Sequence, residues 1–282
     1  MDILNNYDIL IPILSAIVSG TLSYLAANII HSYNKKYNKK EKAIDLANEF
    51  SKLITETTFD AGEINKQVYK EIGIDKKIKS LEDKKILHFD KHELQEYFTE
   101  EEINKYIRFK TIGNVKFVKL LSKSYKTESD YDLCLSKIIL SFDSNKTIKE
   151  NLRGNSWNYN IKGNDILLNE KDVERGIIDI YKTHFKLELH ALNKLEWFSM
   201  SFVNNIAEEK VVYQSLHQVF LSMCLSEYIN ISLKNEIGHE KFYINLINQY
   251  NIWNKHKQKE IKRVNKRNYK NRNGYTVPKK LR

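Results

Sequence analysis

Apolar residues recur at intervals of three and four along most of the chain, which is the spacing of one face of an α-helix. The pattern is broadest in the C-terminal third, where it predicts long helices over residues 170–204, 208–236 and 240–266. In the first of these, the apolar face includes Phe185 and Leu189. Three helices with broad apolar faces and short turns are expected to pack antiparallel.

A fourth periodic stretch, residues 41–72, predicts a helix that joins the other three in an up-down bundle. Gly73 is expected to cap the C-terminus of this helix. The chain has no proline between residues 13 and 277 and nine glycines in all, so it offers few turn signals. A sheet protein of this length normally needs more of them. The expected fold class is therefore all-α.

The region from residue 74 to residue 168 has a weaker pattern. Residues 75–85 are polar and are expected to form a solvated connector. Shorter helices are expected over residues 90–98, 100–121 and 130–152, and Thr99 followed by Glu102 predicts a capping box at the start of the second. Two apolar runs then flank Gly163 and Asn164, as in a small hairpin or an irregular loop. We expect this region to be inserted between helices of the bundle.

Residues 9–30 form an apolar stretch of 22 residues without a charge. A helix needs about 20 such residues to cross a bilayer. A cleaved signal peptide is the alternative, but the first eight residues contain two acids and no basic residue, unlike the start of a signal peptide. The sequence therefore predicts a permanent transmembrane anchor.

Basic residues on one side of the anchor indicate its orientation. Five lysines follow the apolar stretch: Lys35, Lys36, Lys39, Lys40 and Lys42. Basic residues mark the cytoplasmic side, so the N-terminus is expected outside and the C-terminal domain in the cytoplasm, in a single-pass protein of the inner membrane. Two cysteines without a paired spacing, Cys134 and Cys224, agree with a reducing compartment.

Small residues form a ridge along one face of the anchor, at successive i, i+4 positions: Ser15, Ser19, Ser23 and Ala27. Small side chains let transmembrane helices approach closely, so this face predicts a homo-oligomer. The alternative is that such residues are simply common in membrane helices.

The net charge of +10 belongs to the C-terminus, because residues 255–282 contain twelve Lys/Arg and one acid. Contacts with an anionic surface are expected at Lys262, Arg263, Lys266, Arg267, Lys270 and Arg272. Membrane lipid is the favoured partner of this polybasic tail. Nucleic acid and a purely solubilising role are the alternatives.

The expected organisation has five parts. They are an anchor over 1–32, a juxtamembrane helix over 33–73, an inserted region over 74–168, a three-helix core over 169–254 and the basic tail over 255–282.

Motifs of common enzyme classes are missing from the sequence: it has no GxxxxGK[ST], GxGxxG, GxSxG or HExxH. His88 and His92 share a helical spacing but lack further ligands, and Glu236 and His239 form a single ExxH where a di-metal site needs two. Four further residues on the long helix are interpreted as surface or capping groups: His184, Glu188, His190 and Glu196. We expect no catalytic residue, cofactor or metal.

Residues 192–253 resemble a bacterial family, the domain of unknown function number 4760. The resemblance rests on Leu192-Asn193, on residues 195–198 (LEWF), on the small residues 199–201 and on Glu208-Glu209. Members look like a membrane helix followed by a helical domain, and similar membrane proteins are associated with phage abortive infection. The signature positions in this chain are Asn193, Glu196 and Phe198.

Glu196 lies among apolar residues near the end of a long predicted helix. Its carboxylate is expected to accept hydrogen bonds from the start of the next helix, near residues 207–209.

The resemblance implies a membrane-anchored, non-enzymatic effector or accessory protein of a bacterial anti-phage defence system. It would act through oligomerisation and membrane attachment, with membrane lipid and a partner protein from the same operon as its expected partners. The alternative function is a membrane-tethered scaffold or receptor that recruits a partner protein or nucleic acid through its basic tail.

Overall fold

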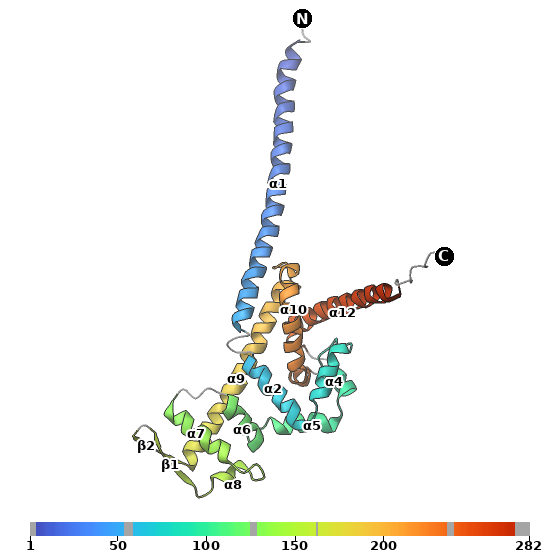
Figure 1. Cartoon of the computed structure of the whole chain (residues 1–282). Coiled ribbons are helices and arrows are strands. Elements are labelled where there is room, and N and C mark those ends of the chain that lie inside the picture. Colours follow the sequence, from blue (N-terminus) through green and yellow to red (C-terminus); the bar gives the residue numbers. More distant parts are fainter. Residues whose placement is uncertain (1–3, 54–58, 125–128, 162, 236–239, 274–282) are drawn as a thin grey trace, which may run out of the picture.

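Figure 1 shows the computed structural model of the chain. The structure describes residues 4–53, 59–124, 129–161, 163–235 and 240–273. Within these ranges, side chains are described from residue 24 to residue 268, apart from residues 53, 59, 60 and 164.

The described residues form twelve α-helices and one pair of strands, so the all-α expectation is confirmed apart from a single hairpin. The first helices are α1 (Leu4–Leu53), α2 (Phe59–Ile72), α3 (Asp75–Ser80), α4 (Lys91–Tyr97), α5 (Glu100–Phe109) and α6 (Val115–Ser124). The later elements are α7 (Asp130–Ser141), α8 (Ile148–Leu152), β1 (Ser156–Ile161), β2 (Asn164–Asn169), α9 (Glu170–Val203), α10 (Glu209–Ser226), α11 (Tyr228–Lys234) and α12 (Ile244–Asn273).

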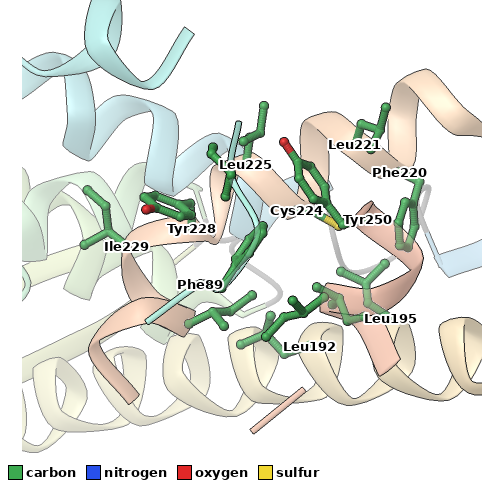
Figure 2. Close-up of a cluster of buried hydrophobic side chains, with 14 of the residues drawn as sticks. Phe89, Leu192, Leu195, Phe220, Leu221, Cys224, Leu225, Tyr228, Ile229 and Tyr250 are labelled. Carbon is green, nitrogen blue, oxygen red and sulfur yellow. The ribbon is translucent and has the colours of Figure 1, made fainter. Parts of the chain in front are cut away.

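The main core lies where the C-terminal part of α1 meets α9, α10 and α12. Its centre is aromatic: the Phe198 ring lies 4.6 Å from that of Phe50 and 6.2 Å from that of Trp253, measured between centroids. Figure 2 shows the adjoining part of this core, in which Cys224 lies against the ring of Tyr250. Burying one such ring contributes about 2–3 kcal/mol, so this cluster is a principal source of stability.

Helix α1 projects from the rest of the molecule over most of its length (Figure 1). Only its last turns enter the core, through Ala43, Leu46 and Phe50, which recur at helical spacing. Two bonds fix it to the α9–α10 turn: Lys39 Nζ donates to Asn205 Oδ1 at 2.9 Å, and Glu208 N donates to the Lys39 carbonyl at 3.1 Å.

The single helix expected over residues 41–72 is two helices, α1 and α2, which run in different directions (Figure 1). The end of α2 agrees with the sequence. Gly73 adopts a left-handed φ of 81° and its N–H donates to the Lys70 carbonyl, as in a glycine C-cap.

The solvated connector expected over 75–85 is wrong in part. It contains α3 and a 3₁₀ turn, Leu81–Asp83, and it buries Ile78 and Leu81 in the main core. Aromatic residues further along, such as Phe89 and Phe117, belong to that same core. The residues expected as an insertion therefore supply part of the main core.

A second, smaller core joins the rest of this region to the first turns of α9. Its members include Val118, Ile138, Leu168 and Ile177. Strands β1 and β2 pair antiparallel, with Trp157 opposite Leu168, so the hairpin alternative is confirmed over the irregular loop.

Three further predicted helices are each divided. Residues 130–152 form α7 and α8, which separate at Phe142. Residues 100–121 form α5 and α6, which separate at Lys110. Helix α5 begins with the expected Thr99–Glu102 capping box. Residues 208–236 form α10 and α11, which separate at Glu227. The breaks at Lys110 and Glu227 each place a charged residue in the interior.

Two helical glycines differ in the space around them. A Cβ on Gly62 would make an ordinary contact, 3.6 Å from Ser226 Oγ, whereas a Cβ on Gly176 would overlap the buried side chain of Leu135.

We therefore expect the same substitution to have opposite effects at these sites. Gly62→Ala should stabilise the chain by up to about 1 kcal/mol through helix propensity. Gly176→Ala should destabilise it by about 1–3 kcal/mol, because Leu135 is held in the smaller core. Urea unfolding of both variants measures this, and a gain of stability in Gly176→Ala would contradict the packing described here.

Candidate functional site

Helices α2, α5, α9 and α10 meet around a buried cluster of charged and amide side chains. Lys110 Nζ lies 2.6 Å from Glu188 Oε1 and donates to Asn65 Oδ1 at 3.1 Å. Asn65 Nδ2 donates to Glu227 Oε1 at 2.7 Å and approaches Glu188 Oε1 at 3.3 Å. The four side chains thus satisfy one another's polar atoms away from solvent, as buried charges require.

Each member comes from a different place in the chain. Asn65 lies on α2, Lys110 follows the last turn of α5, Glu188 lies in the middle of α9, and Glu227 forms the junction of α10 and α11. Two of the helix breaks that the sequence pattern did not predict therefore supply two of the four members.

Tyrosine side chains cover the cluster. Tyr106 OH lies 3.3 Å from Lys110 Nζ, and the rings of Tyr69 and Tyr106 stack with centroids 5.8 Å apart. Tyr69 OH donates to the Ser226 carbonyl at 2.6 Å, and Asn230 Nδ2 donates to Glu227 Oε2 at 3.1 Å.

The two carboxylates share one ammonium group, and their pKa values diverge. Burial, followed by the neighbouring charge of Glu188, raises the pKa of Glu227 from 4.5 to about 7. Burial alone would also raise the pKa of Glu188, but the charge of Lys110 and the hydrogen bonds from Lys110 and Asn65 together outweigh burial and lower that pKa. Glu188 is therefore the charged partner of Lys110, and Glu227 holds a proton more readily.

His184 lies one turn before Glu188 and is also buried. Burial, followed by the charge of Lys110, lowers its pKa from 6.5 to about 4, so its ring is neutral at neutral pH. Its edge faces Phe117, with centroids 5.7 Å apart, and neither ring nitrogen has a hydrogen-bond partner among the described residues.

The surface interpretation of His184 and Glu188 is therefore wrong. The predicted apolar face of α9 is one residue out of phase at two positions only: Phe185 and Leu189 are each 48% exposed, whereas His184 and Glu188 face the core. A glutamate on a helix normally faces solvent, but Glu188 can be buried because Lys110, 78 positions away in the sequence, donates to its carboxylate. His190 is exposed, as expected.

The cluster is chemically suited to holding helices together. Its carboxylates and amide are almost completely buried, which leaves a substrate no route to them, and each is occupied by a neighbouring side chain. Within the described ranges, no three His, Cys, Asp or Glu residues are grouped closely enough to hold a metal ion.

The basic C-terminal segment continues α12 without a break as far as Asn273. Residues 255–268 contain seven Lys/Arg and one acid. Lys262, Arg263, Lys266 and Arg267 are all exposed, and they form no ion pair among the described residues. We call these four residues the α12 basic face; Lys270 and Arg272 follow on the same helix, beyond the described side chains.

The acidic signature residue Glu196 caps a helix, but not the one expected. Its carboxylate accepts from Leu246 N at 2.8 Å and Asn245 N at 3.1 Å, at the start of α12 rather than α10. The packing of α9 along α12 brings these positions together. Of the other signature positions, Phe198 is buried and Asn193 is exposed.

The predicted anchor lies on the projecting part of α1. Among helices whose side chains the structure describes, none combines the length and the apolar character needed to cross a membrane. Ser15, Ser19 and Ser23 lie outside the described side chains, and Ala27 is exposed. Self-association through this face stays a prediction, which a membrane association assay on a Ser19→Leu, Ser23→Leu double variant would test.

No protein-family model, curated protein or solved structure matches this chain. The resemblance of residues 192–253 to a bacterial family stays a prediction.

The buried cluster should make stability depend on pH. Native Glu227 holds its proton up to about pH 7, whereas an unfolded glutamate loses it near 4.5. The native state therefore binds more protons in this interval, and the contribution of Glu227 to stability is lost as pH rises through it. His184 has the opposite sign between pH 4 and 6.5, because its native pKa is lowered.

Glu227→Gln isolates the first effect, because glutamine resembles the protonated acid and cannot ionise. We expect the free energy of unfolding of this variant to increase relative to that of wild type between pH 5 and pH 8, because only wild type loses stability as Glu227 ionises. Urea unfolding at several pH values measures this, with Glu174→Gln on the exposed face of α9 as the matched control. A difference that does not change with pH would contradict the assignment.

Proposed function

We propose that this chain is a membrane-anchored, non-enzymatic effector or accessory protein of a bacterial anti-phage defence system of the abortive-infection type. It lies in the inner membrane with its N-terminus outside and its helical domain in the cytoplasm, and it acts through membrane attachment and self-association. The defence role is supported by the family resemblance of residues 192–253.

One observation carries the proposal of attachment: a single helix, α1, contains both the uncharged stretch 9–30 and the docked residues Ala43 to Phe50. An anchor in the first part would therefore be joined to the helical domain without an intervening loop. The lysines between the two parts favour the cytoplasmic side. Lys39 and Lys42 also contact the domain, the latter 5.6 Å from the centre of the Trp197 ring.

A phage-plating assay tests the defence role, comparing cells that carry the gene and its operon with cells that carry an empty vector. We expect fewer plaques together with reduced survival of infected cells. Unchanged plating and survival across a diverse phage panel would defeat the defence proposal.

A charge in the proposed anchor tests attachment. Arginine in the middle of a transmembrane helix costs about 3 kcal/mol. We expect Ile17→Arg to remove the chain from the membrane fraction and to abolish protection. Ile44→Arg is the matched control, since Ile44 is an exposed residue of the same helix, within its docked part. An active C-terminal alkaline phosphatase fusion would overturn the proposed topology. Membrane retention of Ile17→Arg would overturn the assignment of residues 9–30 as the anchor.

The α12 basic face supports a second candidate function, a membrane-tethered scaffold or receptor. Four exposed cations on a continuous helix present a fixed array to an anionic partner, unlike a disordered tail. Anionic lipid is the favoured partner, with nucleic acid or a partner protein from the same operon as the alternatives. Each basic group near an anionic membrane contributes about 1 kcal/mol.

Replacing all four residues of the α12 basic face with Gln removes about 4 kcal/mol of attraction and should weaken binding to phosphatidylglycerol vesicles about a thousandfold, and less so in high salt. The control replaces four exposed lysines elsewhere, Lys146, Lys149, Lys171 and Lys182, with the same change in net charge. Equal losses in both variants would mean that overall charge alone is responsible. Tighter binding to duplex DNA than to vesicles would favour nucleic acid.

A further inference from the structure

A groove runs between α2 and α3 on one side and α10 on the other. It contains a cavity of about 310 Å³ whose walls include Tyr69 and Ile78 on the first side and Leu225 on the second. A neighbouring cavity of about 330 Å³ shares Glu82, Ser222 and Leu225 with it. The two cavities adjoin at these three residues, and together we call them the α2–α10 groove.

The first cavity has the dimensions and lining of a small-molecule site. Its volume lies at the lower end of the range for such sites, which are mostly apolar with a few polar groups. The apolar surface comes from Tyr69, Ile78 and Leu225, all of them buried members of the main core and therefore fixed in position.

The charges at its rim are predominantly positive. Three lysines line the cavity: Lys66, Lys70 and Lys79. Lys66 has a long ion pair with Glu63 at 3.6 Å, whereas Lys70 and Lys79 have no ion pair among the described residues.

Two acids also line the cavity, and they leave a positive excess. Glu82 is engaged by Lys257 at 3.3 Å, and Asp75 begins α3, where a carboxylate is favoured by the helix terminus. Lys70 and Lys79 thus remain available, on α2 and α3 respectively, to neutralise a ligand.

We propose that the α2–α10 groove binds a small amphipathic anion, with an apolar ring or chain and one phosphate, sulfonate or carboxylate group. The apolar part packs on Ile78 and Leu225, and the anionic group meets Lys70 and Lys79. A cation would be repelled by the lysine excess, and the cavity is too small for a folded partner. This inference is independent of the membrane and defence proposals.

A bound ligand would also touch the element that leads to the buried cluster. Ser226 lines the cavity, accepts the Tyr69 hydroxyl through its carbonyl and immediately precedes Glu227. Occupation of the groove would therefore hold α2 and α10 together where they contribute Asn65 and Glu227 to the cluster.

Calorimetric titration of the full chain in detergent tests the proposal, with 1-naphthyl phosphate as the anionic probe and 1-naphthol as its neutral counterpart. Identical titrations into micelles alone correct for partition. We expect saturable binding of one naphthyl phosphate per chain and weaker binding of naphthol. No saturable binding of the phosphate at millimolar concentration would overturn the proposal.

Three variants locate the site. Lys70→Gln with Lys79→Gln should weaken naphthyl phosphate binding about two- to thirtyfold, since each of the two exposed charges contributes about 0.2–1 kcal/mol, and should leave naphthol binding unchanged. Lys76→Gln with Lys84→Gln is the control, with the same charge change at exposed lysines outside the groove. Ser222→Trp, at an exposed position, should block both probes by filling the groove.

All variants are first compared by circular dichroism, so that a loss of binding is interpreted only for folded chains. Equal weakening in the two lysine pairs would assign binding to general charge and overturn the proposed site. Unaltered binding in folded Ser222→Trp would do the same.

Discussion

The bond between Lys110 and Glu188 constrains the arrangement of the whole helical domain. Both groups are almost fully withdrawn from water, and neither is stable there without the other. Removing one partner of a buried ion pair typically costs about 3–5 kcal/mol, because the remaining charge is left without compensation. The chain must therefore bring the end of α5 to the middle of α9 in one register, and Asn65 then links this pair to α2 and to Glu227. The aromatic core supplies most of the apolar burial, but aromatic packing tolerates small shifts that a 2.6 Å ion pair does not.

Much of the fold could be predicted from the sequence because a helix is indicated by apolar residues that recur locally at intervals of three and four. The long helix α9 begins and ends within one residue of its predicted limits, since Asn169 caps its start and the chain takes a left-handed φ of 56° at Asn205. The capping box at Thr99 and the glycine cap at Gly73 are likewise local, and both were found.

The candidate site was missed because its determinants are not local. The breaks at Lys110 and Glu227 lie in periodic sequence and are fixed by contacts with residues more than 40 positions away. Glu196 illustrates the same limit. The chemistry of its carboxylate predicts a capping role, and proximity in the sequence favours the start of α10. In the folded chain, however, the start of α12 packs beside Glu196 and donates to it instead. A signal did exist on α9: His184 and Glu188 lie one turn apart and continue the helical spacing between the buried residues Ile177 and Leu192.

The docking of α1 gives the molecule the mechanics of a lever. A helix of 50 residues is about 75 Å long, and only its last few turns are held, by Ala43, Leu46, Phe50 and the bonds of Lys39. A tilt of 10° about this short docked segment moves the distant end of α1 by about 10 Å, whereas the Phe50 ring shifts by about 1–2 Å. A shift of that size is comparable to the spacing that separates good from poor ring packing around Phe198. Large, weak displacements at the free end of α1 would thus be converted into small, strongly resisted displacements in the aromatic core.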